Sequence, residues 1–198
     1  MAHEAGVRRL RATAVALAGA GAVLLAHGLW IPAKAVLAQA LMERAFGHEE
    51  GGGASRPWPW ADFVPLARLR APRLAASAIV VSSATGAALA FGPGHVAGSA
   101  PPGGPGNVVL AGHRDTHFRF LRELRPGDAL ELETRRGVRT AYRVAWAGIV
   151  HERDTALLGT ADTDVLTLVT CWPFDAIRPG GTWRYVVVAE AEHGVGPL

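Results

Sequence analysis

The feature that most limits how this chain can fold is a run of 22 residues without a charged side chain, from Ala12 to Ala33. At a rise of about 1.5 Å per residue, a helix of this length matches the hydrocarbon thickness of a bilayer. The run therefore predicts a transmembrane helix. Two other interpretations stay open: a cleaved signal peptide, because residues 33–35 have the small-x-small form of a cleavage site, and a buried helix of a soluble protein.

Positive charge is unequally distributed around this run. Arg8, Arg9 and Arg11 precede it, whereas only Lys34 follows closely. The positive-inside rule then puts the N-terminus in the cytoplasm and the bulk of the chain across the membrane. We expect a single-pass protein of the cytoplasmic (inner) membrane with a periplasmic or extracellular domain.

The sequence divides into four expected parts: a cytoplasmic N-terminus at 1–11, the anchor at 12–33, a membrane-proximal helix and stalk at 34–73, and an exported domain at 74–198. In the exported domain, short β-rich runs alternate with Gly, Pro and Asp, which predicts an all-β barrel or sandwich. A short helix is expected at 117–124. The expected strands are 78–82, 87–91, 107–111, 129–133, 140–150, 165–170 and 182–189.

Composition narrows the choice of function. The net charge is only +3, the arginines are scattered and aromatic residues make up 7%, so the sequence does not favour a nucleic-acid partner. Cys171 is the single cysteine, which excludes an intramolecular disulfide and a multi-cysteine zinc site. This thiol is then either a buried structural group or a reactive one.

Three residues of complementary chemistry stand at strand ends. His113 follows the expected strand 107–111, Cys171 follows 165–170, and Arg184 lies near the start of the last strand. A thiol with a free pKa near ~8.5 is mostly protonated at neutral pH, so covalent catalysis needs a basic or cationic neighbour. A guanidinium beside a carbonyl under attack can stabilise the developing oxyanion. Each residue alone has an ordinary structural explanation; together they predict a nucleophilic enzyme.

The motifs around these residues resemble those of the sortases, a family of membrane-anchored cysteine transpeptidases. The matching residues are Leu110-Ala-Gly-His113-Arg114, Thr167-Leu-Val-Thr170-Cys171 and Arg184 on the following strand. The similarity covers roughly residues 70–190.

Longer strings refine this resemblance. Residues 113–120, 171–181 and the Arg-Pro-Trp-Pro-Trp stretch at 56–60 look most like the sortases of Gram-negative, marine proteobacteria, or class GN. The family resemblance implies a closed eight-stranded sortase-type β-barrel with short helices.

The resemblance also implies a mechanism. Cys171 would attack the threonine carbonyl of an LPxTG-like sorting signal on an exported protein, and an amine acceptor would resolve the resulting thioester. His113 would transfer protons, and Arg184 would hold the peptide and the oxyanion. Thr170 could hydrogen-bond the substrate or the backbone, and Asp115 could orient groups near His113.

Other functions stay open at this stage. His113, His117 and Cys171 could be read as a metal site, although the expected strand end at His113 does not favour a shared face, and neither a metal nor a cofactor is expected. A cysteine peptidase or hydrolase would use the same acyl-enzyme, and another cell-wall acyl-transferase would use similar groups. The non-enzymatic alternative is a membrane-anchored β-barrel that binds peptide.

Overall fold

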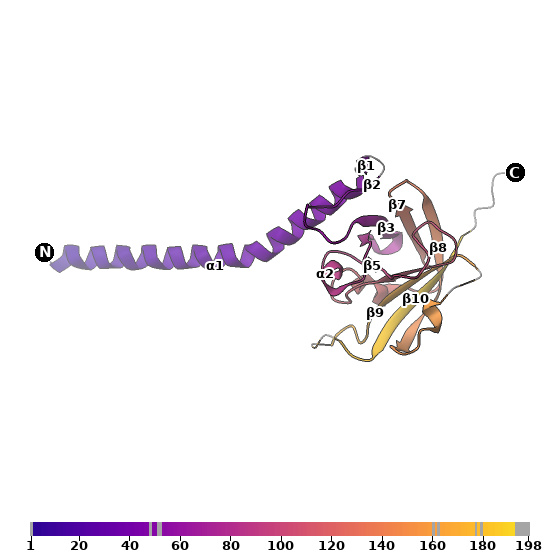
Figure 1. Cartoon of the computed structure of the whole chain (residues 1–198). Coiled ribbons are helices and arrows are strands. Elements are labelled where there is room, and N and C mark those ends of the chain that lie inside the picture. Colours follow the sequence, from indigo (N-terminus) through magenta and orange to yellow (C-terminus); the bar gives the residue numbers. More distant parts are fainter. Residues whose placement is uncertain are drawn as a thin grey trace. The chain divides into compact units, whose positions relative to one another are not determined.

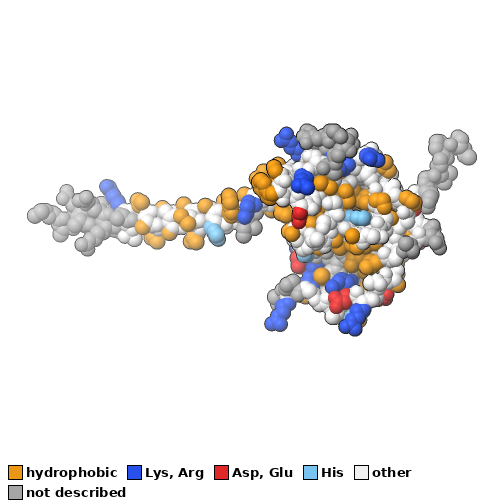
Figure 2. Space-filling view, in the orientation of Figure 1, with side chains coloured by type: hydrophobic (Ala, Val, Ile, Leu, Met, Phe, Trp, Pro, Cys, Tyr) orange, Lys and Arg blue, Asp and Glu red, His pale blue; other side chains and the backbone are white. Residues whose placement is uncertain are grey.

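The computed structural model describes residues 2–47, 49–50, 53–159, 161, 163–176, 178 and 180–192. The chain forms two compact units, residues 1–40 and 41–198. The first consists of most of helix α1 (Ala2–Gly47). From Thr13 onward this helix is long and apolar enough to cross a membrane, with a mean hydropathy of 1.9 over its best window, none of which is buried. Hydrophobic side chains recur along its visible face in Figure 2.

The second unit is a β-barrel (Figure 1). It is closed, with the strand order β10-β8-β7-β3-β4-β5-β6-β9. Two pairs, β4–β5 and β6–β9, are parallel, and the other pairs are antiparallel. The barrel strands are β3 (Pro65–Ala71), β4 (Ala76–Val81), β5 (Gly94–His95), β6 (Asn107–Ala111), β7 (Ala129–Thr134), β8 (Arg139–His151), β9 (Val165–Cys171) and β10 (Trp183–Ala191). The eight-stranded all-β architecture expected from the sequence is therefore confirmed.

Short elements complete the fold. A two-stranded pairing of β1 (Glu49–Glu50) with β2 (Gly53–Ala54) precedes the barrel. The connections between the barrel strands contain η1 (Pro72–Leu74), α2 (Gly86–Leu89), η2 (Arg119–Glu123) and η3 (Ala156–Leu158). Of these, η2 lies within the range 117–124 where the sequence predicts a helix, although it is a 3-10 helix.

Two local expectations were wrong. The barrel starts at Pro65, within the segment expected to be a stalk, because β3 turns only proline, leucine and small alanines toward the core and places arginines outside. This leaves no apolar run to recognise. The strand expected at 87–91 is the helical turn α2 (Gly86–Leu89). Its alanines favour helix and lack the β-branched side chains that pack well in a sheet.

The barrel interior holds the main core, which follows the two-residue period of the strands. On β9, Leu166 and Leu168 are fully buried inside, so Val169 and Cys171 belong to the outer face. On β10, Val187 and Ala189 point inward, so Arg184 and Val186 share that outer face. Large side chains fully buried in the interior include Leu69, Leu110, Phe118, Leu121, Leu132 and Tyr142.

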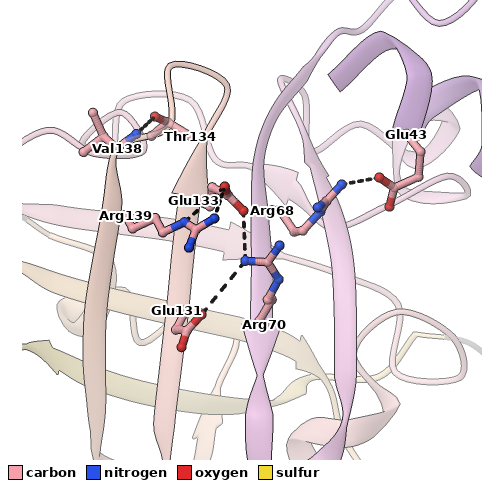
Figure 3. A network of polar contacts seen from close by, with 8 residues as sticks. All are labelled: Glu43, Arg68, Arg70, Glu131, Glu133, Thr134, Val138 and Arg139. Atoms are coloured by element: carbon pink, nitrogen blue, oxygen red, sulfur yellow. Dashed lines mark hydrogen bonds and ion pairs between the residues drawn. The ribbon is translucent and has the colours of Figure 1, made fainter. Parts of the chain in front are cut away.

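A second core cluster forms outside the barrel, where the last turns of α1 pack on β4. Met42 and Phe46 from the helix contact Phe63, Ile79 and Val81. Ion pairs flank this contact: Figure 3 shows Glu43 paired with Arg68 on β3, beside a network of Arg70, Glu131, Glu133 and Arg139 on β3, β7 and β8. The residues from Leu41 onward therefore belong to the barrel unit.

Candidate active site

Cys171 and Arg184 are direct neighbours across two strands. Cys171 ends β9, and its register partner on the antiparallel strand β10 is Arg184. The Trp172 amide donates to the Trp183 carbonyl at 3.0 Å, so the pair formed by Trp172 and Trp183 is a hydrogen-bonded one. In an antiparallel ladder the next pair is non-hydrogen-bonded, with its side chains close together on one face. The thiol and the guanidinium therefore start from adjacent positions on the outer face.

His113 emerges beside Cys171 because β6 and β9 run in parallel. Ala111 is paired with Val169, and the Gly112 amide donates to the Val169 carbonyl at 3.1 Å. Two residues beyond this pair, the two neighbouring segments carry His113 and Cys171. The imidazole is exposed and Cys171 is partly exposed, so both groups are open to a bound molecule.

Phe118 holds the turn that carries His113 in place. The amide of Phe118 donates to the His113 carbonyl at 3.0 Å, and the Phe118 ring is fully buried. The ring lies directly against Gly112, where a Cβ atom would be 2.7 Å from a ring carbon. Only glycine fits here without moving the ring, which explains the glycine before the histidine.

Thr170 joins the two strand ends. Its side chain points into the barrel, is 3% exposed, and its hydroxyl donates to the Gly112 carbonyl at 2.7 Å. Of the two contacts considered from the sequence, substrate or backbone, the structure shows the backbone one. The bond links the residue before Cys171 to the residue before His113.

Arg184 is held by three acceptors. Its Nη2 donates to Glu152 Oε2 at 2.8 Å, and its Nη1 donates to the carbonyls of Gly181 and Trp183 at 2.7 and 3.0 Å. Glu152 directly follows β8, whose end pairs with the start of β10. Sequence reasoning missed Glu152, because an acidic residue after a strand carries no pattern that identifies its partner.

Asp115 does not contact His113 through any hydrogen bond or ion pair in the described part of the chain. Its carboxylate is largely exposed, and Oδ1 lies 3.5 Å from Nε of Arg114. Arg114, which the sequence placed in the histidine motif without a role, has a side chain that is only 3% exposed. Its Nη2 donates to the carbonyls of Ala176 and Arg178, beyond Cys171, at 2.8 Å each.

His117 lies four residues beyond His113 but has a different environment. It is half-buried, with Nε2 3.5 Å from the Ala90 carbonyl. Burial lowers the pKa of His117, the hydrogen bond to Ala90 partly opposes this, and a positive charge on His113 lowers it further. Among the described residues, no three His, Cys, Asp or Glu side chains gather in a group that could hold a metal ion.

The outer face thus carries a thiol, an imidazole and a fixed guanidinium at one end of the β6–β9–β10 sheet. A thiol can attack a carbonyl, an imidazole can move the proton, and a guanidinium can balance the negative charge that develops on oxygen. This set of groups is suited to acyl transfer. The three residues lie in or directly after β6, β9 and β10, so the barrel strands set their backbone positions.

Comparisons with known proteins agree with this chemistry. A family model described as the sortase domain matches residues 69–192. Sortase D of Bacillus subtilis (strain 168) is 36% identical over 123 residues, which cover 62% of this chain and 61% of that protein. The chain therefore spans less than two thirds of this curated relative's length.

Solved structures show the same fold. Sortase A from Corynebacterium diphtheriae has a TM-score of 0.60 and 27% identity, covering 67% of this chain and 63% of that one. Sortase C-1 from Actinomyces oris has a TM-score of 0.59 and 26% identity, covering 79% of this chain and 82% of that one. Because the family model matches well over half of the sequence, the chain belongs to the sortase family.

Proposed function

We propose that this protein is a membrane-anchored cysteine transpeptidase that cleaves an LPxTG-like sorting signal on an exported protein and transfers the protein to an amine. The observation that carries the proposal is the pairing of Cys171 with Arg184 across β9 and β10, with His113 following the parallel neighbour β6. The family membership supports the same reaction class.

The proposed reaction has two steps. In the first, the Cys171 thiolate attacks the threonine carbonyl carbon, the threonine–glycine C–N bond breaks, and the departing amine takes a proton from the protonated His113. In the second, an acceptor amine attacks the thioester carbon, the neutral His113 takes the amine's proton, and Cys171 leaves as the thiolate while a new amide forms. In both steps the Arg184 guanidinium faces the negative charge on the carbonyl oxygen.

The test is a peptide-cleavage assay on the full chain in detergent. Wild-type protein should convert a peptide containing LPxTG and an added amine, triglycine, into the transfer product, with a thioester adduct on Cys171 detectable by mass spectrometry. Cys171→Ala should form neither adduct nor product while keeping its thermal midpoint. Cleavage by this variant would show that Cys171 is not the nucleophile.

The same assay separates transfer from hydrolysis. Cys171 is partly exposed, so water can also reach a thioester formed there. We expect the transfer product to predominate at millimolar triglycine. If the free acid predominates at every amine concentration, the protein is a cysteine hydrolase, which is the second candidate function.

We further propose that α1 anchors the protein with its N-terminus in the cytoplasm, and that the protein is of the Gram-negative class GN type. The uncharged run and the arginines before it support the anchor and its orientation. Because Cys171 is the only cysteine, a membrane-impermeant maleimide reports on topology directly. It should label Cys171 in spheroplasts without lysis. Labelling only after lysis would show that the barrel lies in the cytoplasm, which contradicts the proposed orientation.

A further inference from the structure

We propose that Arg114 is a positioning residue that fastens the chain beyond Cys171 to the turn that carries His113. It would thereby set the separation between the thiol and the imidazole. This inference deepens the proposed function and rests on it for its catalytic consequence, while the contacts themselves do not depend on which peptide is cleaved.

Burial is the first argument. The Arg114 side chain is only 3% exposed, although it carries a permanent positive charge. A charge removed from water must be offset by specific contacts, because burial without them is unfavourable. Arg114 makes such contacts across a long sequence separation: Nη2 reaches the carbonyls of Ala176 and Arg178, both at 2.8 Å.

The position of Arg114 in the chain is the second argument. It directly follows His113, and the Phe118 amide fixes the His113 carbonyl at 3.0 Å. The guanidinium therefore extends from a backbone that is already held in place. A shift of the chain beyond Cys171 would have to break the two carbonyl contacts.

The far side of the Cys171 segment is held in a different way. Trp172 stacks on Tyr185 of β10 with ring centroids 5.8 Å apart, and Phe174 packs edge-on against both rings at 5.6 and 5.2 Å. These rings hold the segment to the strand that carries Arg184. Arg114 supplies the corresponding link to His113, so the contacts connect all three residues of the proposed site.

The shape of the guanidinium is the third argument. One nitrogen serves two carbonyls while Nε faces the Asp115 carboxylate at 3.5 Å. The other terminal nitrogen, Nη1, is buried and makes no hydrogen bond within the described part of the chain. A lysine ammonium cannot reproduce this planar set of donors and would keep only some of the carbonyl contacts. We therefore expect lysine to replace arginine only in part.

The experiment compares Arg114→Gln and Arg114→Lys with wild type, using the full chain in detergent. Arg119→Ala, an exposed arginine at the start of η2, is the matched control. Hydrogen exchange at Trp172–Ala176 should be ~10-fold faster in Arg114→Gln. In the triglycine assay kcat should fall ~100-fold, as expected for displaced reacting groups, while KM changes less than ~3-fold. Arg114→Lys should be intermediate, and Arg119→Ala should match wild type.

A third readout, the rate of Cys171 alkylation by iodoacetamide between pH 5 and 9, does not depend on a sorting signal. The pH profile should change in Arg114→Gln and be partly restored in Arg114→Lys. Unchanged exchange and an unchanged profile in both variants would overturn the proposal, as would a kcat loss no larger than the loss of folded protein. If Arg114→Gln does not fold, Arg114→Lys decides by the same criteria. If wild type turns over no peptide, the proposed function fails, while exchange and alkylation still test the positioning.

Discussion

The two ends of the parallel β6–β9 pair use their polar side chains in opposite ways. Asn107 starts β6, and its side-chain partner Thr167 lies two residues into β9, is fully buried and donates its hydroxyl to Asn107 Oδ1 at 2.8 Å. Asn107 in turn donates to the carbonyls of Leu157 and Gly159, both at 3.0 Å. At the other end, the side chains of His113 and Cys171 are open and make no hydrogen bond within the described residues.

The difference separates polar groups that the fold uses from those that it leaves available. The backbone pairing is continuous along both strands, so it cannot distinguish the two ends. The segment after β8 makes the difference: its carbonyls at 157 and 159 accept hydrogen bonds from Asn107. In the part of the chain that the structure describes, the side chains of His113 and Cys171 have no such partner. Removing a satisfied buried group should cost stability, and removing an open group should cost activity.

The largest expected effect is at the open end. His113→Ala should lower kcat/KM for peptide transfer by ~10³-fold, which is about 4 kcal/mol of transition-state stabilisation, because the proton transfers lose their donor and acceptor. The thermal midpoint should stay within ~2 °C, since the imidazole is exposed. Turnover and melting of the full chain in detergent check both parts. Near-wild-type turnover would show that His113 takes no part in the reaction. It would then contradict the assignment of the open end of the β6–β9 pair to activity.

Asn107→Ala should have the opposite signature. It removes the amide that the Gly159 carbonyl accepts from and the shorter hydrogen bond of the Thr167 hydroxyl, which keeps only the Leu157 carbonyl at 3.4 Å. This should cost about 2–3 kcal/mol, or roughly 5–10 °C in the thermal midpoint. Transfer activity at a temperature where the variant is folded should stay within ~3-fold of wild type.

Thr167→Val is the matched control for Asn107→Ala, because it removes the hydroxyl from the other side of the same bond. The double variant should lose less stability than the two single losses together. A hundredfold loss of activity at an unchanged midpoint would contradict the division between the two ends.

The same division explains what could be predicted from the sequence. Residues 108–111 and 165–170 are continuous aliphatic or β-branched runs bounded by Asn107 and Gly112 and by Asp164, and each is followed within two residues by His113 or Cys171. No role for Arg114, a residue of the histidine motif, or for Glu152 could be predicted, because their partners lie 62 or 64 and 32 residues away in the sequence. β3 escaped because its core positions are mainly small. Long-range partners and weakly apolar strands can be recognised only from the tertiary contacts of the folded chain.

Glu152→Gln tests a residue that is intermediate between the buried, hydrogen-bonded polar groups and the open ones. Its ion pair with Arg184 is half-exposed, and Arg184 keeps the carbonyls of Gly181 and Trp183 when the pair is lost. We expect kcat/KM to fall only ~3-fold to 10-fold, with no change in the thermal midpoint, because partly exposed ion pairs are weak. Adding 0.5 M NaCl should narrow the gap between wild type and variant. A loss as large as that of His113→Ala would make Glu152 a full member of the open site.

His117 gives the smallest expected effect and asks whether the division follows strand ends or individual residues. It lies at the open end, yet it is half-buried against the Ala90 carbonyl and its pKa is lowered, mainly by burial. The unfolded chain therefore binds a proton more readily than the folded one as pH falls below the ordinary histidine pKa of ~6.5. The stability contribution of the neutral imidazole is complete above that pH, is lost as pH falls through it, and levels off below the folded pKa.

Between pH 7.5 and 5.5 the thermal midpoint of wild type should thus fall more than that of His117→Gln, by at most ~3 °C. Turnover of His117→Gln at pH 7.5 should stay within ~3-fold of wild type. If the variant instead loses activity and its melting keeps the wild-type pH dependence, His117 acts with His113, and the boundary between used and open groups follows the strand end rather than burial.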